Sequence, residues 1–192
     1  MRRKGFVLNL AGSLALAFAL GPLGANVSQA AAFTITSPSF ADNEIIPKKH
    51  AAKGGPRKCD GENISPALQW SNAPAGTKSF AIVVTDAVGG HGLGIVHWVG
   101  YGIPASTTSL AEGAVSKPSK AYVGGKNVIK KGFYFGPCPD VGDNPHHYEF
   151  KIIALDLAPD ALAPGLDLAG LFKAIKGHNL SATSIVGRYA RE

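Results

Sequence analysis

The sequence predicts an all-β domain, mainly antiparallel, with one helix near the C-terminus packed against it. Short apolar and β-branched runs alternate with turns rich in glycine and proline along most of the chain. Convincing helical periodicity is confined to a region between residues 160 and 177. No internal repeat or second-domain linker is recognisable, so strands and helix are expected to form one layered domain.

The start of the chain has the pattern of a signal peptide. Residues 2–4 are Arg-Arg-Lys, residues 6–23 are apolar, and Ser-Gln-Ala at residues 28–30 offers a small-x-small cleavage site. Glycine and proline interrupt the apolar run, which argues against a membrane-anchoring helix. We therefore divide the chain into a signal peptide, residues 1–30, and a domain, residues 31–192. The expected location is periplasmic or secreted, in a bacterium.

The net charge of the predicted domain is modest. The first thirty residues hold three of the 19 Lys and Arg and no acid, which leaves 16 basic and 13 acidic residues, a charge of +3. Together with the export signal, this charge argues against a nucleic-acid partner. Anionic small molecules and lipid surfaces remain candidate partners.

The predicted strands follow one another along the domain. Early strands are short, the middle ones are long apolar runs, and a last strand closes the chain: residues 33–36, 45–47, 67–70, 81–86, 95–99, 148–154 and 184–189. Residues 48–58 are basic and punctuated by glycine and proline. They fit a solvated surface loop or, alternatively, a mobile rim that attracts anions toward a pocket. Residues 106–127 are polar and glycine-rich, which predicts a long surface excursion.

The helix is predicted within residues 160–177. Asp167 is a candidate N-cap, and Gly177 suits the position just after the C-terminal end. Four apolar residues between them have the spacing i, i+3, i+4 and i+7 and are expected to face the sheet: Leu168, Leu171, Phe172 and Ile175.

Cys59 and Cys138 are the two cysteines of the sequence. In an oxidising compartment an even number favours a disulfide, and the alternative is a pair of neighbouring buried thiols. A lone pair has no zinc-binding spacing, so no metal is expected at the cysteines.

Ionisable side chains stand in or at the ends of apolar strands. Side chains alternate along a strand, so Asp86 is predicted on the inward face of residues 80–86, and His146 on the same kind of face as Tyr148. His97 lies in a strand that is apolar on both faces, and alternation therefore leaves its direction open. Burying such groups is costly without a partner. They either close a structural hydrogen-bond network or line a polar pocket, and we favour an anion-binding pocket.

Residues 59–70 form the run Cys-Asp-Gly-Glu-Asn-Ile-Ser-Pro-Ala-Leu-Gln-Trp. This run resembles the signature Cys-Asp-Gly-x-Asn-x-Ser-Pro-x-Leu-x-Trp of the phosphatidylethanolamine-binding protein family, in its bacterial Raf kinase inhibitor-like branch. Further matches stand in family order and cover nearly all of the domain: residues 74–81, 97–99, 103–104, 136–139, 145–148 and 154–156.

The resemblance implies an antiparallel β-sandwich with peripheral helices and a non-catalytic protein without a cofactor. The implied ligands are small anions or phosphorylated headgroups. His97 matches the strand histidine of the family pocket and His146 the later histidine, so both are expected to donate hydrogen bonds. Asp86 is expected to accept from a ligand amine or hydroxyl, or to fix a histidine tautomer.

The pocket wall is also implied by the resemblance. The Gly136-Pro137 loop, with residues 133–135 before it, matches this wall, and Gly136 is expected to allow close approach by the ligand. Tyr148 contributes its hydroxyl or belongs to the core. The expected ligand-binding set is Asp86, His97, Gly136, Pro137, His146 and Tyr148.

One loop departs from the family pattern. Where the family usually has Asp-Pro-Asp-Ala-Pro, residues 86–90 read Asp-Ala-Val-Gly-Gly, and Asp140 replaces a usual proline after Cys138. Loss of prolines, which fix φ, predicts a more flexible and wider pocket wall. The added His91 either refills part of the pocket or, as we favour, lies on the surface.

Two alternative functions remain open at this level. The first is a modulator or inhibitor of another protein, with residues 48–58 as the contact surface. The second is a metal-dependent hydrolase that uses two histidines and a carboxylate, although no local metal-binding spacing supports it. The sequence leaves the oligomeric state open, a homodimer included.

Overall fold

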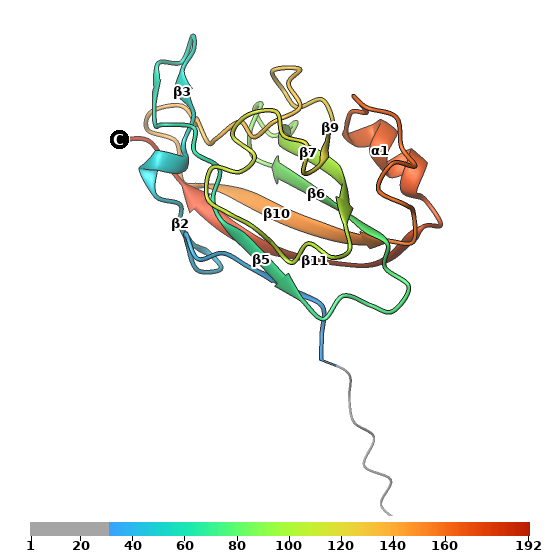
Figure 1. The fold of residues 1–192 in the computed structure, drawn as a ribbon. Helices are drawn as coiled ribbons and strands as arrows, with labels where there is room; N and C mark the ends of the chain where they lie inside the picture. Colours follow the sequence, from blue (N-terminus) through green and yellow to red (C-terminus); the bar gives the residue numbers. More distant parts are fainter. Residues whose placement is uncertain (1–30) are drawn as a thin grey trace, which may run out of the picture. The chain divides into compact units, whose positions relative to one another are not determined.

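A six-stranded sheet forms the centre of the fold (Figure 1). The computed structural model describes residues 31–192, and the predicted signal peptide lies outside them. The strand order is β2-β11-β10-β6-β7-β9, and the pairs are antiparallel apart from β2 and β11. The strands are β2 (Glu44–Ile45), β6 (Ser79–Asp86), β7 (Ile95–Pro104), β9 (Val123–Gly124), β10 (His146–Leu155) and β11 (Asn179–Tyr189).

A three-stranded sheet covers one face of the large sheet. It consists of β1 (Thr34–Thr36), β5 (Leu68–Ser71) and β8 (Ser109–Leu110). Side chains such as Ile35 and Trp70 from this sheet share a buried cluster with Phe80 and Ile82 of β6. Burial of these large side chains, at roughly 25 cal/mol for each Å² of apolar surface, is what holds the two layers together. The fold is therefore the predicted mainly antiparallel β-sandwich.

The single α-helix of the described residues, α1 (Leu168–Ile175), covers the opposite face of the large sheet. Asp167 caps it by accepting a hydrogen bond from the Gly170 amide at 2.8 Å. The helix begins directly after the predicted cap and fills the second part of the predicted region, whereas residues 160–167 form turns and irregular backbone. No helix within residues 31–192 is long and apolar enough to span a membrane.

The apolar stripe of α1 is narrower than the spacing predicts. Leu171 and Ile175 are buried against the sheet, whereas Phe172 remains 43% exposed. The helix makes only about two turns, so a narrow apolar stripe along one side is enough to pack it against the sheet.

The long segment between β7 and β10 is more than the predicted surface excursion. It contributes β8 and β9 and places Leu110, Val115 and Tyr122 in the main buried cluster. The basic segment 48–58 also has regular structure. It holds the 3-10 turn η1 (Lys48–His50) and β3 (Lys53–Gly54), and β4 (Cys59–Asp60) follows directly. The side chain of His50 is fully buried.

Candidate anion-binding site

Two neighbouring strands bring a carboxylate and an imidazole together. Asp86, the last residue of β6, pairs in register with Tyr148 of β10, two residues after His146. The Asp86 Oδ2 accepts a hydrogen bond from His146 Nδ1 at 2.7 Å, and both side chains are buried. Because an ionised carboxylate can only accept, this contact keeps a proton on Nδ1 of His146.

The second oxygen of Asp86 shapes the loop that follows β6. Oδ1 accepts hydrogen bonds from the backbone amides of Val88 and Gly89, each at 3.0 Å. A side chain at Gly89 would place its Cβ 2.6 Å from Asp86 Oδ2, so this position requires glycine for the carboxylate to hold its place. Asp86 therefore has protein partners on both oxygens, and these contacts orient His146 and hold a proton on its Nδ1.

A β-bulge directs His97 toward this pair. In the β6–β7 register, Val84 lies opposite Trp98 and Thr85 lies opposite Val96, which leaves His97 as the extra residue. A bulge disturbs the strict alternation of faces and re-aims one side chain. His97 consequently contacts Tyr148 edge to face, with ring centroids 5.1 Å apart, although strand periodicity left its direction open.

The two ring nitrogens of His97 have different surroundings. Nδ1 donates to the carbonyl oxygen of Phe135 at 2.8 Å, and the ring stacks on the Phe135 ring. Nε2 is buried and has no hydrogen-bond partner within residues 31–192. Burial lowers the pKa of His97, since desolvation disfavours the charged ring. Nε2 of the neutral ring is then an unsatisfied acceptor, available to a ligand that donates a proton.

These groups line one cavity of about 450 Å³. Asp86, His97, His146 and Tyr148, which the sequence predicted as site residues, all contribute to its wall. Tyr148 is also part of the main buried cluster, so the two interpretations of this residue apply together. Burial raises the pKa of its phenol, which keeps the hydroxyl protonated and able to donate.

Gly136 and Pro137 are not among the residues that line the cavity, and the structure gives the glycine a packing role. A Cβ on Gly136 would lie 2.2 Å from the carbonyl oxygen of His50. The glycine thus permits close packing of two backbone segments behind the wall, and its amide donates to Asn63 Oδ1 at 2.8 Å. Phe135, within the segment expected before it, supplies the lining instead.

The remaining wall combines apolar side chains with a basic rim. Sequence analysis offered such a rim as one of two interpretations of residues 48–58. Lys53 and Arg57 stand at this rim, and Arg57 forms an exposed ion pair with Asp140 at 3.4 Å. The other lining residues are Gly54, Gly55, Pro56, Cys59, Gly89, Ile95, Val128, Ile129, Phe135, Cys138 and Pro139.

Cys59 and Cys138 form a disulfide in this wall, with Cα atoms 5.8 Å apart. It joins β4 to the loop that carries Pro139, so two segments 79 residues apart in sequence meet at the cavity. The arrangement found is therefore the bridge rather than two neighbouring thiols.

Sequence analysis did not identify two asparagines, Asn63 and Asn127, that hold the loops of the wall. The side chain of Asn127 donates to the carbonyl oxygens of His97 and Phe133 and accepts from the amide of Lys131 at 2.9 Å. Asn63 similarly bridges Tyr134 and Gly136. Each asparagine satisfies backbone groups of a loop that forms the wall. The signal that could have found Asn63 is its place in the motif of residues 59–70; Asn127 carries none.

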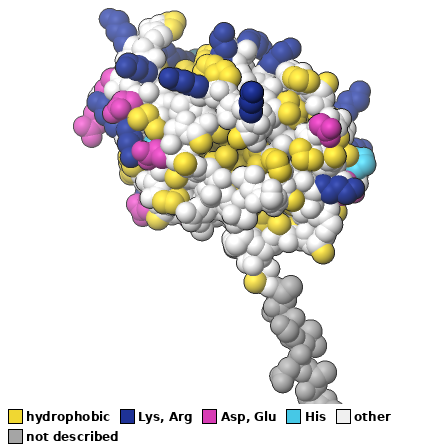
Figure 2. Space-filling model, viewed as in Figure 1, with side chains coloured by type: hydrophobic (Ala, Val, Ile, Leu, Met, Phe, Trp, Pro, Cys, Tyr) yellow, Lys and Arg dark blue, Asp and Glu magenta, His cyan; other side chains and the backbone are white. Residues whose placement is uncertain are grey.

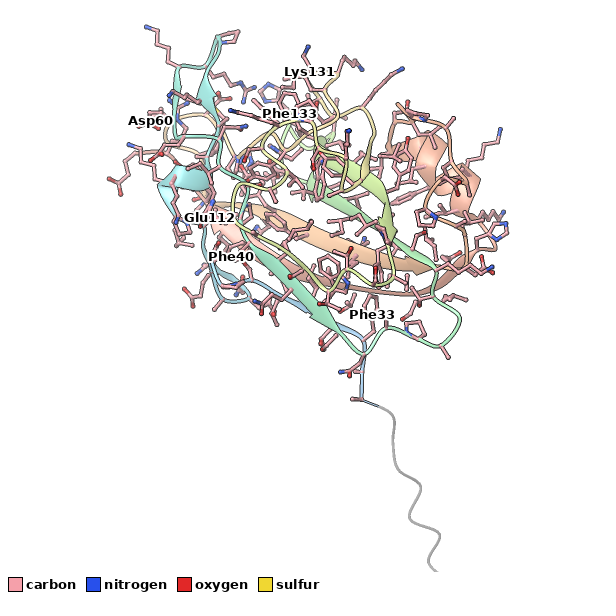
Figure 3. The ribbon with its side chains drawn as sticks, in the orientation of Figure 1. Phe33, Phe40, Asp60, Glu112, Lys131 and Phe133 are labelled. Atoms are coloured by element: carbon pink, nitrogen blue, oxygen red, sulfur yellow. A yellow bond between two sulfur atoms is a disulfide. The ribbon has the colours of Figure 1, made fainter. Side chains whose placement is uncertain are left out.

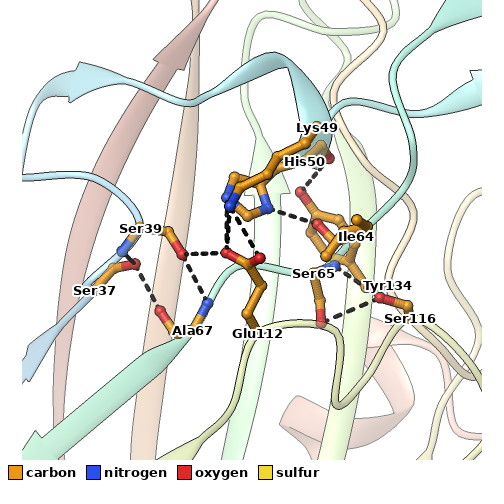
Figure 4. A network of polar contacts seen from close by, with 10 residues as sticks. All are labelled: Ser37, Ser39, Lys49, His50, Ile64, Ser65, Ala67, Glu112, Ser116 and Tyr134. Carbon is orange, nitrogen blue, oxygen red and sulfur yellow. Dashed lines mark hydrogen bonds and ion pairs between the residues drawn. The ribbon is translucent and has the colours of Figure 1, made fainter.

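A polar network supports the wall from behind (Figure 4). His50 donates from Nδ1 to the carbonyl oxygen of Ile64 at 2.7 Å, and its own carbonyl oxygen accepts from the Tyr134 hydroxyl at 3.0 Å. Its Nε2 lies 3.7 Å from Glu112, which both Lys49 and Ser39 contact. Burial lowers the pKa of His50, as it does for His97.

These two histidines predict a loss of stability in mild acid. Both stay neutral in the folded state, whereas in the unfolded chain each takes up a proton near pH 6.5. Their contribution is fully present above pH 6.5 and is lost as the pH falls toward the lowered pKa of each ring. Each adds a slope of up to about 1.4 kcal/mol per pH unit. Chemical denaturation between pH 7 and 5 measures it.

In the His97→Gln variant, the free energy of unfolding should change less steeply with pH than in the parent. The difference in slope corresponds to up to one proton. The exposed His178 provides the matched control, and His178→Gln should leave the slope contributed by the buried rings unchanged. Equal slopes in the parent and the His97→Gln variant would contradict the assignment.

The loop of residues 87–94 has its own internal hydrogen bonds. Gly92 donates to the Val88 carbonyl at 2.9 Å, and Gly94 donates to the Gly89 carbonyl at 2.8 Å. His91 is exposed and lines a neighbouring hollow rather than the cavity, in agreement with the favoured surface position. Within residues 31–192 no group of three His, Cys, Asp or Glu side chains is placed to hold a metal ion.

Fold and site together define a class of protein: a β-sandwich with a small histidine- and aspartate-lined pocket at one end of its main sheet. The sequence profile described as phosphatidylethanolamine-binding protein matches residues 36–190. The chain therefore belongs to the phosphatidylethanolamine-binding protein family.

Individual relatives agree with this assignment. The chain is 41% identical over 132 residues to UPF0098 protein YbcL of Escherichia coli (strain K12), which covers 67% of this chain and 71% of that protein. It is 34% identical over 182 residues to a UPF0098 protein of Aquifex aeolicus (strain VF5), with 94% and 99% covered. A protein of Mycobacterium tuberculosis named as a lipoprotein, LppC, is 40% identical over 137 residues, with 67% and 60% covered.

Solved structures show the same fold. The crystal structure of Escherichia coli YbcL, described as a new member of the mammalian PEBP family, superposes with a TM-score of 0.76 at 32% identity. That match covers 84% of this chain and all of the YbcL chain. A homologue from Chlamydia trachomatis, CT736, gives a TM-score of 0.71 at 29% identity, with 84% and 99% covered.

Proposed function

We propose that this protein binds small anions or phosphorylated headgroups in the cavity between Asp86, His97 and His146, and that it does so without catalysis. The observation that carries the proposal is the buried, unpartnered Nε2 of His97 in a cavity that also holds the Asp86–His146 pair. Buried polar atoms in native proteins usually have a partner. Four buried side-chain atoms of the described residues have no partner, and of their residues only His97 lines the cavity, where a ligand can complete the hydrogen bonding.

The cavity offers three kinds of contact to such a ligand. The Tyr148 hydroxyl is a donor, and Lys53 and Arg57 supply positive charge at the rim. Nε2 of His146 lies 3.3 Å from Asp143, whose side chain is 46% exposed. An anion could replace this half-exposed carboxylate while Asp86 continues to hold the other ring nitrogen. The surrounding apolar side chains exclude water and strengthen each of these contacts.

Histidine NMR tests the proposal directly. Addition of inorganic phosphate, acetate or glycerophosphoethanolamine should shift the ring signals of His97 and His146. The exposed rings of His91, His147 and His178 lie outside the cavity and serve as internal controls. If none of the three compounds moves the signals of His97 and His146, the proposal fails.

Binding should take up a proton at His97. The neutral ring keeps its proton on Nδ1, where the Phe135 carbonyl holds it, so Nε2 repels an oxygen that can only accept. Dimethyl phosphate is a suitable probe because it keeps a single negative charge and has no hydrogen-bond donor. Its affinity is expected to rise as the pH falls from 8 toward the lowered pKa of His97, by up to about tenfold per pH unit. Isothermal titration calorimetry in buffers of different ionisation enthalpy measures both affinity and proton uptake.

The His97→Gln variant provides the control for this prediction. It should bind dimethyl phosphate with an affinity that varies less with pH, because the titrating ring is gone. A flat profile in the parent protein would show that His97 is not the proton-linked ligand, even if binding itself occurs.

Export is part of the proposal. It is supported by the signal-peptide pattern of residues 1–30, by the disulfide and by the relative named as a lipoprotein. The matched relatives are named as UPF0098 proteins or as a lipoprotein rather than as enzymes. Mass spectrometry of the protein recovered from its producing cell would test the predicted cleavage after Ala30.

A further inference from the structure

Three of the segments that line the cavity, at one end of the six-stranded sheet, are here called the mouth loops: residues 53–58, 87–94 and 125–132. A fourth segment, residues 135–146, also lines the cavity and carries Asp140 and Asp143. Each mouth loop supplies lining residues, for example Lys53, Gly89 and Val128. In Figure 1 the β3 hairpin and the loop after β9 both stand along the upper edge of the domain. Figure 3 shows Lys131 at the same edge, on the side of the domain away from Phe33.

The mouth loops carry a concentrated positive charge. They contain one arginine and five lysines and no acidic residue: Lys53, Arg57, Lys58, Lys126, Lys130 and Lys131. The rest of residues 31–192 holds ten basic and thirteen acidic residues and is therefore net negative. The five lysines form no ion pair within the described residues, and Arg57 pairs with Asp140. Figure 2 shows many of the Lys and Arg side chains of this face along its upper part.

The same loops expose large apolar side chains. Four of the eight exposed large hydrophobic residues in the described part of the chain lie in them: Val88, Leu93, Val128 and Ile129. Leu93 is 92% exposed, with glycine on both sides, so nothing in the fold shields it. Two of the others, Val128 and Ile129, also line the cavity, which joins the apolar patch to the pocket.

We infer that the mouth loops dock this protein on a bilayer that contains anionic phospholipid, with the cavity open to the headgroup layer. Apolar side chains that project among unpaired lysines suit a bilayer interface. The apolar side chains insert into the interface, and the lysines remain among the anionic headgroups. An acidic protein partner that lacks an apolar surface would pair with the lysines and leave Leu93 in water. The inference rests on the proposed function, because it explains how a headgroup reaches the pocket without leaving its membrane.

Vesicle sedimentation tests this inference with the chain produced from Ala31 onward, which contains both large buried clusters and the disulfide. Vesicles of phosphatidylcholine with phosphatidylglycerol should bind the protein, and vesicles of phosphatidylcholine alone should bind much less. Added salt should weaken the binding because it screens the exposed charges.

The test variant is Lys126→Gln/Lys131→Gln/Leu93→Ser, whose three positions do not line the cavity. Each lysine should contribute about fivefold, so partitioning is expected to fall by about 25-fold or more. The matched control is Lys78→Gln/Lys176→Gln/Leu180→Ser. These residues lie near Ser79, Leu155 and Asn179, at the opposite end of the sheet, and the control should bind vesicles like the parent.

A reporter at the loop tip tests the orientation. Leu93→Trp should emit at shorter wavelength when phosphatidylglycerol vesicles are added, because its ring enters a less polar layer. Failure of docking is separable from failure of the pocket. Asp86→Asn should lose soluble anion binding and keep vesicle binding, whereas the triple variant should do the reverse. The inference is overturned if the parent does not sediment with anionic vesicles, or if the test and control variants lose binding equally.

Discussion

Replacement of Cys59 and Cys138 by alanine is expected to lower the free energy of unfolding by about 4 kcal/mol, the largest effect of any change considered. The disulfide closes a loop of 79 residues, and in the chain-entropy description a loop of this size restricts the unfolded chain by about that amount. Most small domains are stable by only about 5–15 kcal/mol. The variant should therefore unfold at a much lower denaturant concentration or temperature.

Alanine is the suitable replacement because both cysteines are buried, and serine would bury an additional hydroxyl. Urea denaturation of parent and double variant measures the difference, and the parent unfolded in the presence of a phosphine reductant provides an independent comparison. Agreement between reduced parent and double variant would assign the effect to the bridge. A difference below about 1 kcal/mol between oxidised and reduced parent would contradict the prediction.

The disulfide is also expected to affect ligand binding in the cavity. Cys59 and Cys138 join two parts of the cavity wall, and Arg57 reaches the carbonyl oxygen of Cys138 only at 3.4 Å. Without the bridge, the basic rim should move more freely relative to Pro139. Reduction under conditions where the chain stays folded is therefore expected to weaken anion binding.

Asp86→Asn is expected to lower the affinity for phosphate or glycerophosphoethanolamine by about tenfold or more. Two backbone amides point at Oδ1, so the amide oxygen of asparagine should take that place and its NH₂ should face His146. The NH₂ group can only donate, which moves the imidazole proton from Nδ1 to Nε2. This tautomer still offers an N–H to an anion, so the lower affinity comes from the missing carboxylate, which in the parent stabilises the doubly protonated, positively charged ring. Hydrogen bonds that involve a charged group contribute about 1.5–3 kcal/mol, and each 1.4 kcal/mol is a factor of ten.

Calorimetric titration measures the affinity, and the ¹⁵N shifts of His146 report the tautomer. The second readout matters because Asp86 acts through His146, and a merely structural effect would not reverse its tautomer. Loss of binding with the His146 tautomer unchanged would contradict this explanation.

Two other carboxylates provide matched controls. Asp156 accepts from His178 Nδ1 at 2.8 Å in an exposed pair that follows the far end of β10, so Asp156→Asn breaks a similar pair without affecting binding. Asp143 contacts the other nitrogen of His146, where it would compete with a bound anion. Asp143→Asn should leave the affinity unchanged or raise it, the opposite direction to Asp86→Asn.

Strand periodicity predicted much of this site. Side chains alternate along a β-strand whatever the rest of the fold does, so Asp86 and His146 could be assigned to inward-facing rows. The motifs of residues 59–70 and 145–148 carried the family resemblance, and the family match agrees with it. Strand periodicity did not report the two asparagines. Asn63 bonds backbone groups of Tyr134 and Gly136, more than 70 residues away, and Asn127 holds its own loop to the His97 carbonyl oxygen.

The sequence by itself determined the β-rich class, the late helix with its Asp167 cap, and the facing of Asp86 and His146, because each depends on near neighbours along the chain. Only the tertiary structure decided the direction of His97, the packing behind Gly136 and the gathering of lysines and Leu93 around one opening. The bulge at His97 depends on the register of the partner strand, and the need for glycine at residue 136 depends on the backbone packed against it. The surface patch depends on loops that are far apart in the sequence. Local periodicity contains none of these distances.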